Sequence, residues 1–127
     1  MTEKNAPAEP PAEVYRRYLE GGELGFMRCG ECGAAIFYPR VLCPVCGSAS
    51  LEWRTSSGQG VVYATTAVYR RDGEPYNVAL VELEEGFRMM SRIEGVAAEE
   101  VEVGMAVSLR VLDEVDGPVA VFVAEER

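Results

Sequence analysis

The second half of the chain alternates apolar and polar residues with the period of a β-strand. In residues 76–84 (YNVALVELE), Ala79, Val81 and Leu83 share one face of the predicted strand. Clusters of glycine, proline and aspartate separate the apolar runs as turns. The pattern predicts five strands, at residues 58–70, 76–84, 87–94, 105–112 and 119–124, with a short helical turn at 97–102. This order is that of an OB-fold barrel, although the strand count also suits other small barrels.

The first half contains a different pattern, with apolar residues at helical spacing in residues 12–21 (AEVYRRYLEG). Val14, Tyr15, Tyr18 and Leu19 fall on one face, Pro11 suits the helix start, and the glycines after Glu20 end it. This helix packs on its own domain, or it presents its side chains to a partner or an anionic ligand. The candidates for such contacts are Tyr15, Arg16, Arg17 and Tyr18. The composition of residues 1–11, rich in Pro, Glu and Ala, predicts a disordered tail.

All four cysteines lie between these two parts, in two Cys-x-x-Cys pairs. Cys29 and Cys32 form the first pair, Cys43 and Cys46 the second, and glycine follows each. Two such pairs facing each other bind one metal ion in a closed tetrahedral four-thiolate site. Zinc is the expected metal, and the same ligands also suit iron. Disulfides or a redox dithiol are the alternatives, but the N-terminus has no secretory signal pattern and no βαβ unit is predicted.

The segment between the two cysteine pairs, residues 34–42 (AAIFYPRVL), is strongly apolar for a loop on a metal site. Some of these side chains must pack onto the next module, and the rest are expected to form exposed aromatic surface. We therefore divide the chain into a tail (1–11), a helix (12–22), a metal ribbon (23–54) and an OB-fold (55–127). Because the ribbon is too small to fold on its own core, the metal supplies its folding free energy. Loss of a ligand is expected to unfold the ribbon while the barrel partly survives.

The charge distribution argues against nucleic-acid binding, and the absence of histidine argues against catalysis by this chain. Residues 1–54 carry a net charge of −1 and residues 55–127 a net charge of −8, so the OB-fold half should repel nucleic acid. A chain with no histidine lacks the commonest general acid–base residue, and a site closed by four thiolates does not activate water. The carboxylates at Glu82, Glu84 and Glu85 are the densest acid–base candidates, but they fit an exposed strand end and turn. No apolar run approaches the roughly 20 residues of a membrane span, and we expect a cytoplasmic protein.

Several stretches resemble the DUF35 family of acyl-CoA-associated proteins, which consist of an N-terminal helix, a rubredoxin-like zinc ribbon and an OB-fold. The matching stretches are CGECG, FYPR, CPVCGS, LEWRTSSGQGVVY, PYNVALVELEEGFRMMS and VGMAVSL. They lie in family order and cover the whole chain except its tail. Where the family often has two prolines before the arginine, this chain has Tyr38-Pro39-Arg40. The resemblance implies a mainly β protein with Zn²⁺ on Cys29, Cys32, Cys43 and Cys46.

The resemblance also implies a non-catalytic accessory subunit. Members of the family usually bind thiolase-fold enzymes (ketothiolases, aldolases or acyltransferases) that act on acyl-CoA thioesters, and some help to form the CoA site or channel. We therefore expect a hetero-oligomer with a thiolase-like enzyme subunit, with acyl-CoA possible at the shared interface. The partner-facing or CoA-facing residues carried over are Phe37, Pro39 and Arg40, and Tyr38 and the helix residues Tyr15, Arg16, Arg17 and Tyr18 are added on physical grounds. The alternative is a nucleic-acid-binding ribbon and OB-fold module, which the acidic charge disfavours.

Overall fold

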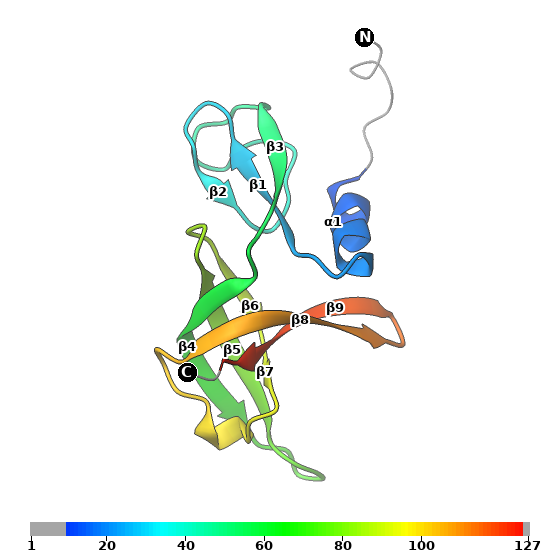
Figure 1. The fold of residues 1–127 in the computed structure, drawn as a ribbon, viewed down its shortest axis with the longest axis vertical. Coiled ribbons are helices and arrows are strands. Elements are labelled where there is room, and N and C mark those ends of the chain that lie inside the picture. The colour runs from blue at the N-terminus through cyan, green and yellow to red at the C-terminus, as the bar shows by residue number, and fades with distance from the viewer. Residues whose placement is uncertain (1–9, 126–127) are drawn as a thin grey trace.

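The computed structural model describes residues 10–125, which form a helix, a small three-stranded sheet and a larger six-stranded sheet (Figure 1). Helix α1 spans Pro11–Glu20 and agrees with the predicted helix. The tail predicted at residues 1–11 lies almost entirely outside the described residues. The strands of the small sheet, in the order β2-β1-β3, are β1 (Gly25–Cys29), β2 (Ala35–Ile36) and β3 (Leu51–Thr55).

The larger sheet contains the strands predicted from the alternating pattern. Their order is β6-β5-β4-β8-β9-β7. The bounds are β4 Gln59–Val68, β5 Tyr76–Leu83, β6 Arg88–Ser91, β7 Ile93–Glu94, β8 Ala106–Glu114 and β9 Gly117–Ala124, with the 3₁₀ helix η2 at Ala98–Glu100. The predicted strand 87–94 is divided in two at Arg92. Its first part pairs antiparallel with β5 and its second part pairs parallel with β9.

The sheet has the OB-fold arrangement, but it is not one continuous hydrogen-bonded barrel. No backbone ladder joins β7 to β5 within residues 10–125. A side chain makes the connection instead, because Asn77 Oδ1 on β5 accepts a hydrogen bond of 2.9 Å from the Ile93 N–H on β7. The prediction of a mainly β chain with a helix, a ribbon and an OB-fold is therefore confirmed, and its barrel is partly open.

The core of the OB-fold continues into the ribbon through a stack of aromatic rings. The Phe26 ring on β1 lies 4.9 Å from that of Phe87, which directly precedes β6, and the Phe37 ring lies 5.2 Å from Phe87 on centroid distances. Tyr15 of α1 meets Phe37 edge-on at 5.5 Å. Stacked and edge-to-face pairs at these distances are favourable beyond the area that they bury. The helix, the ribbon and the OB-fold are thus packed through one set of rings.

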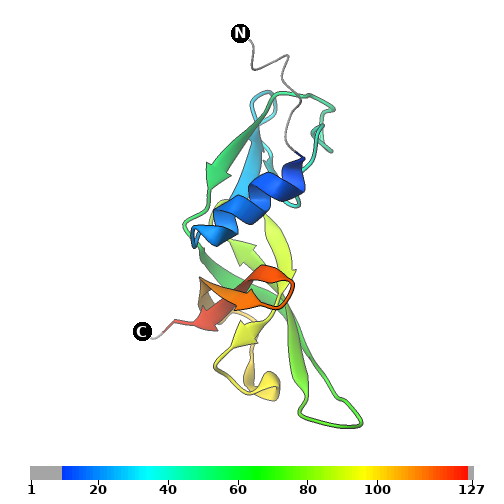
Figure 2. The same cartoon turned by 90° about the vertical axis from the view of Figure 1, so that its right-hand side faces the viewer.

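Helix α1 lies alongside the ribbon and next to the β8–β9 hairpin, as Figure 2 shows. Its Tyr18 ring stacks on Trp53 of β3 at 5.4 Å. Gly25 of β1 makes this approach possible, because a Cβ there would lie only 2.5 Å from the Tyr18 ring. The first interpretation of the predicted helix, packing on its own domain, is therefore correct for this face. No helix within residues 10–125 has the length and apolar character needed to cross a bilayer.

The burial of Tyr15 predicts a loss of stability at high pH. Burial, with a smaller effect of Tyr38, raises the pKa of Tyr15 to about 12. Since the unfolded value is about 10, the folded state holds the proton more tightly. Stability is then unchanged below pH 10 and falls as the pH rises from about 10 to 12. Urea unfolding at pH 8 and pH 11 measures the decrease in the free energy of unfolding between the two pH values. In Tyr15→Phe this decrease should be smaller by about 1 kcal/mol than in the parent. Tyr63→Phe, which changes an exposed tyrosine, is the control and should show the same decrease as the parent.

Candidate metal centre and partner surface

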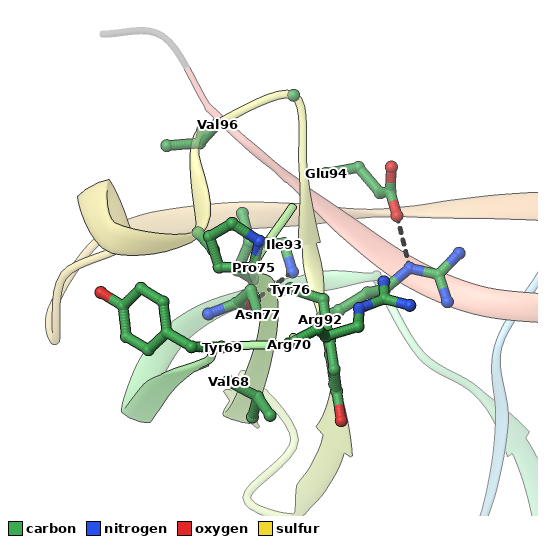
Figure 3. A pocket seen from close by; sticks show the side chains of 12 residues that line it. Val68, Tyr69, Arg70, Pro75, Tyr76, Asn77, Arg92, Ile93, Glu94 and Val96 are labelled. Atoms are coloured by element: carbon green, nitrogen blue, oxygen red, sulfur yellow. Dashed lines mark hydrogen bonds and ion pairs between the residues drawn. The ribbon is translucent and has the colours of Figure 1, made fainter. Parts of the chain in front are cut away.

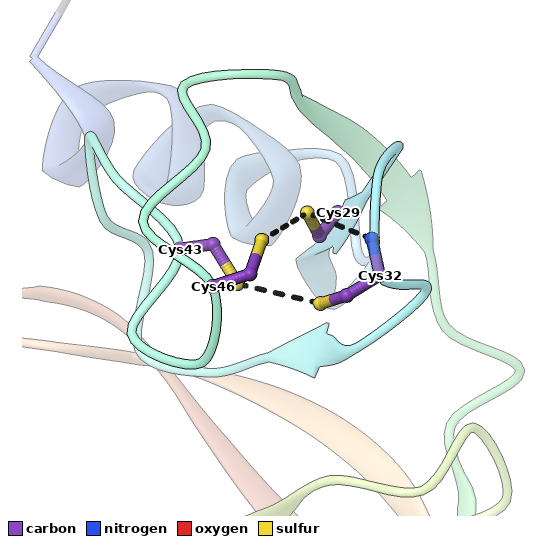
Figure 4. A group of neighbouring side chains, drawn as sticks. All are labelled: Cys29, Cys32, Cys43 and Cys46. Atoms are coloured by element: carbon purple, nitrogen blue, oxygen red, sulfur yellow. Dashed lines mark hydrogen bonds between the residues drawn. The ribbon is translucent and has the colours of Figure 1, made fainter.

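The four cysteine sulfurs converge at one point of the ribbon (Figure 4). All four Sγ atoms lie within 4.8 Å of one another. The Cys29–Cys46 pair is 3.6 Å apart and the Cys32–Cys43 pair 3.7 Å apart. A tetrahedron with metal–sulfur bonds of about 2.3 Å has sulfur–sulfur edges of about 3.8 Å. The sulfur positions therefore fit one four-thiolate metal ion, and the predicted ligand set is brought together.

The local backbone prepares these sulfurs to act as thiolates. Gly33 and Gly47, which follow the two pairs, adopt φ values of 79° and 82°, a conformation that favours glycine. Backbone N–H groups of Glu31 and Cys32 donate to the Cys29 sulfur, both at 3.4 Å. The Cys32 N–H is the largest of the causes that lower the pKa of the Cys29 thiol to about 6. The turn thus stabilises negative charge on sulfur.

The second pair repeats this arrangement. The Val45 N–H donates to the Cys43 sulfur at 3.4 Å. Backbone hydrogen bonds, that of Cys46 foremost, lower the pKa of Cys43. At Cys46 the Ser48 backbone also lowers the pKa, but the neighbouring Cys29 thiol and burial outweigh it and the net shift is upward, to about 12. Four sulfurs so close together ionise fully only when a cation balances their charge. The donor set therefore suits a structural metal.

The predicted partner residues divide into two groups, of which the first packs inward. The Tyr15, Tyr18 and Phe37 rings take part in the aromatic contacts described above. On the exposed side of α1, Arg16 pairs with Glu20 at 3.2 Å. Arg17 is also exposed, and it too has an interaction within the chain. The helix residues thus have structural roles in the isolated subunit, and a role toward a partner remains a prediction.

The second group lies at the tip of the ribbon and faces solvent. Tyr38 is 55% exposed, and Arg40 follows it on the same loop with its backbone N–H directed to Met27 Sδ at 3.4 Å. No described residue forms an ion pair with the Arg40 guanidinium. Pro39 between them is half-buried. The structure thus leaves the Tyr38 ring and the Arg40 side chain exposed on the same loop, one residue apart.

Three further apolar residues are exposed at this tip, and residue-by-residue reasoning did not single them out. Val41 and Val45 are each 72% exposed and Leu42 is 54% exposed. We call Tyr38, Arg40, Val41, Leu42 and Val45 the ribbon tip. Exposed apolar clusters of this kind mark sites of protein interaction. The available signal was the apolar surplus of the loop between the cysteine pairs, which predicted exposed surface without showing which side chains form it.

Arg28 and two of the carboxylates considered as acid–base candidates make contacts inside the protein. Arg28 donates from Nη1 to the Gly33 carbonyl at 2.8 Å. The Glu85 carboxylate accepts hydrogen bonds of 2.7 Å from the Ser56 hydroxyl and from the Ser57 N–H. Glu84 accepts one of 3.0 Å from the Ser57 hydroxyl. These two carboxylates hold the connection between ribbon and OB-fold, a structural role that explains their position.

Comparison with known proteins gives two family matches that together span most of the chain. Residues 21–52 match the model described as ChsH2, rubredoxin-like zinc ribbon domain. Residues 53–112 match ChsH2, C-terminal OB-fold domain. The two matches meet between residues 52 and 53, and the ribbon predicted above ends at residue 54.

Relatives with these domains include short and long proteins. A DUF35 domain-containing scaffold protein of Pyrococcus furiosus is 34% identical over 106 residues, which cover 78% of either protein. A probable enoyl-CoA hydratase alpha subunit of Thermomonospora curvata is 36% identical over 90 residues, and this chain spans only 28% of it. Among solved structures, a chain of the Ltp2-ChsH2(DUF35) aldolase has a TM-score of 0.80 at 30% identity, covering 94% of this chain and 97% of that one.

Proposed function

Because this chain belongs to the DUF35 family, we propose that it is a non-catalytic subunit of an enzyme complex whose catalytic subunit has a thiolase-like fold and acts on an acyl-CoA thioester. The aldolase named above combines Ltp2 with ChsH2(DUF35), and the archaeal relatives are named scaffold proteins. Both names support an assembly role. The metal is Zn²⁺ in this proposal, because it favours a closed tetrahedral thiolate site and the ribbon matches a zinc ribbon model.

The observation that carries the proposal is the ribbon tip. Four of its side chains are apolar and more than half exposed, although the ribbon has few apolar residues for its own core. Burying apolar surface on a partner lowers the free energy by about 25 cal/mol for each Å² removed from water. Tyr38 is one of these four, and tyrosine is enriched at interface hot spots. The tip therefore has the composition of a docking surface.

The metal site supports the tip and takes no part in chemistry in this proposal. Cys43 lies directly after Leu42, and Val45 lies within the second cysteine pair, so the metal fixes the loop that carries these apolar side chains. A four-thiolate ion has no open coordination position for a substrate. Arg40, exposed beside this surface, is suited to pair with a phosphate of CoA through charge-assisted hydrogen bonds. The reaction itself takes place on the partner.

Coexpression with thiolase-fold proteins tests this proposal. We expect one of them to be retained by the tagged chain, with a change in its turnover of an acyl-CoA. The double change Val41→Asp and Leu42→Asp should reduce retention at least tenfold, because it places two charges in the buried interface. Val103→Asp is the matched control, since Val103 is 67% exposed but lies outside the ribbon tip. It should not affect retention.

Arg40→Gln separates docking from CoA binding in the same experiment. It should raise the KM for the acyl-CoA while the complex stays intact. The proposal fails if no thiolase-fold protein is retained or changes in activity, or if the Val41→Asp and Leu42→Asp change leaves retention equal to that of the Val103→Asp control.

A further inference from the structure

A groove of about 720 Å³ lies at the end of the OB-fold remote from the ribbon, where the β4–β5 hairpin meets the segment after β7 (Figure 3). Its walls combine apolar side chains with two tyrosines and two arginines. The lining includes Tyr69, Arg70, Pro75, Tyr76, Ile93 and Val96. The volume is within the range of small-molecule sites. Nothing in the accessory role of the ribbon tip uses this groove.

Of the two arginines in the wall, one is neutralised and the other is available. Arg92 pairs with Glu94 and, at 2.6 Å, with Glu114. Arg70 forms no ion pair with any residue of the part that the structure describes. Its guanidinium instead lies over the Tyr76 ring, 4.8 Å from the centroid. Stacking holds the guanidinium plane in place and leaves its N–H groups free to bind an anion in bidentate fashion.

The charge around the groove indicates a ligand with a single negative charge. Arg70 offers one unpaired positive charge, and the next cation, Arg92, already has two carboxylate partners. Glu94 lines the groove, and Glu99 accepts a hydrogen bond from the Tyr69 hydroxyl at 3.2 Å. A dianionic phosphate would meet these carboxylates with only one free cation. A carboxylate matches both the charge and the fork geometry of a guanidinium.

The rest of the wall indicates the body of such a ligand. Ile93 is buried, Val96 and Pro75 are partly buried, and the Tyr69 and Tyr76 rings are 68% and 42% exposed. An aromatic ring of a ligand packs favourably against exposed tyrosine rings. The apolar side chains of the wall add van der Waals contact that does not depend on the orientation of the ligand. Figure 3 shows the Tyr69 and Tyr76 side chains extending in different directions from the labelled group.

We propose that this groove binds a small aromatic monocarboxylate, with its carboxylate on Arg70 and its ring against the tyrosines and the apolar residues of the wall. This proposal is independent of the docking role, because it concerns the isolated subunit and a surface outside the ribbon tip.

Calorimetric titration of the metal-loaded full chain with 2-naphthoate and its neutral analogue 2-naphthamide tests the assignment. We expect saturable binding of naphthoate, and at least tenfold weaker binding of the amide. Arg70→Gln should weaken naphthoate at least tenfold and leave the amide unchanged. Arg71→Gln, one residue further along the same hairpin and outside the groove wall, is the matched control and should bind both probes as the parent does.

Three results would overturn the proposal. The first is the absence of saturable naphthoate binding up to millimolar concentration. The second is equal affinity for naphthoate and naphthamide, or an equal loss in the Arg70→Gln and Arg71→Gln variants. The third is displacement of naphthoate by an equal concentration of inorganic phosphate. That result would identify a general anion site at which the aromatic ring of the ligand contributes nothing to binding. Loss of the retained thiolase-like partner in the docking experiment leaves each of these results unaffected.

Discussion

Replacing Cys43 with serine is expected to unfold the ribbon and also to destabilise the OB-fold. Cys43 is buried and its sulfur lies 3.7 Å from that of Cys32. The buried cluster of the ribbon otherwise contains only Met27, Cys29 and Ile36 among the described residues, too few for a stable core. Metal binding therefore supplies most of the folding free energy of this module. Without the fourth thiolate, the loop between the cysteine pairs loses its fixed position.

The effect reaches the OB-fold through Phe37. This residue lies between the two cysteine pairs, and its ring stacks on Phe87, which in turn stacks on Phe26. Removing a buried phenylalanine side chain costs about 3 to 5 kcal/mol. Because Phe37 is only partly buried, we expect the OB-fold to lose about 2 kcal/mol through this contact when the loop between the cysteine pairs loses its position. The sequence alone indicated that the barrel would partly survive, and the ring contacts show why it should survive with lower stability.

Urea unfolding of the parent and of Cys43→Ser, each with one equivalent of zinc, measures this coupling. Trp53 fluorescence reports on the ribbon, and far-ultraviolet circular dichroism reports mainly on the larger sheet. Phe37→Ala is the control that retains all four ligands. It should bind zinc normally but show a similar loss in the OB-fold transition. An OB-fold transition in Cys43→Ser that coincides with that of the parent would mean that the two modules fold independently.

The elements that sequence reasoning predicted are those set by local patterns. The alternation in 76–84 and the pairs at Cys29–Cys32 and Cys43–Cys46 depend on neighbours in sequence, and the structure confirms both. The division of the third strand at Arg92 was not predictable. It depends on segments distant in sequence, because the part after Arg92 pairs parallel with β9 and the Ile93 N–H donates to Asn77, 16 residues earlier.

The same limit applies to the candidate site. The apolar loop at 34–42 predicted both packed and exposed side chains, but its alternation does not say which is which. Phe37 packs inward because Phe87 and Tyr15, distant in sequence, provide rings against it. Val41 and Leu42 have no such partners and stay exposed. Tertiary contacts therefore decide which side chains of the loop join the core and which stay exposed, and a single sequence does not contain them explicitly.

Asn77→Ala is expected to destabilise the OB-fold strongly while it leaves the metal site untouched. Asn77 is a buried polar residue on β5. Its Nδ2 donates to Thr65 Oγ1 at 2.8 Å and to the Thr66 carbonyl at 3.2 Å, and its Oδ1 accepts from the Ile93 N–H. The alanine variant leaves the Ile93 N–H buried without an acceptor and removes two other hydrogen bonds. Such losses cost about 2 to 4 kcal/mol together.

Two further variants identify the cause of that loss. Thr65→Val removes one acceptor of the amide and keeps the bond to Ile93, so it should cost only about 1 kcal/mol. Asn77→Asp keeps an acceptor for Ile93 but places a carboxylate beside the Thr66 carbonyl. The stability that Asn77→Asp loses relative to the parent should decrease as the pH falls. At low pH the protonated acid can donate a hydrogen bond to an acceptor of the original amide. Urea unfolding between pH 5 and pH 8 measures all three. If Asn77→Ala were no less stable than Thr65→Val, the bond to Ile93 would contribute little, and β7 would be held to the sheet by its parallel pairing with β9 alone.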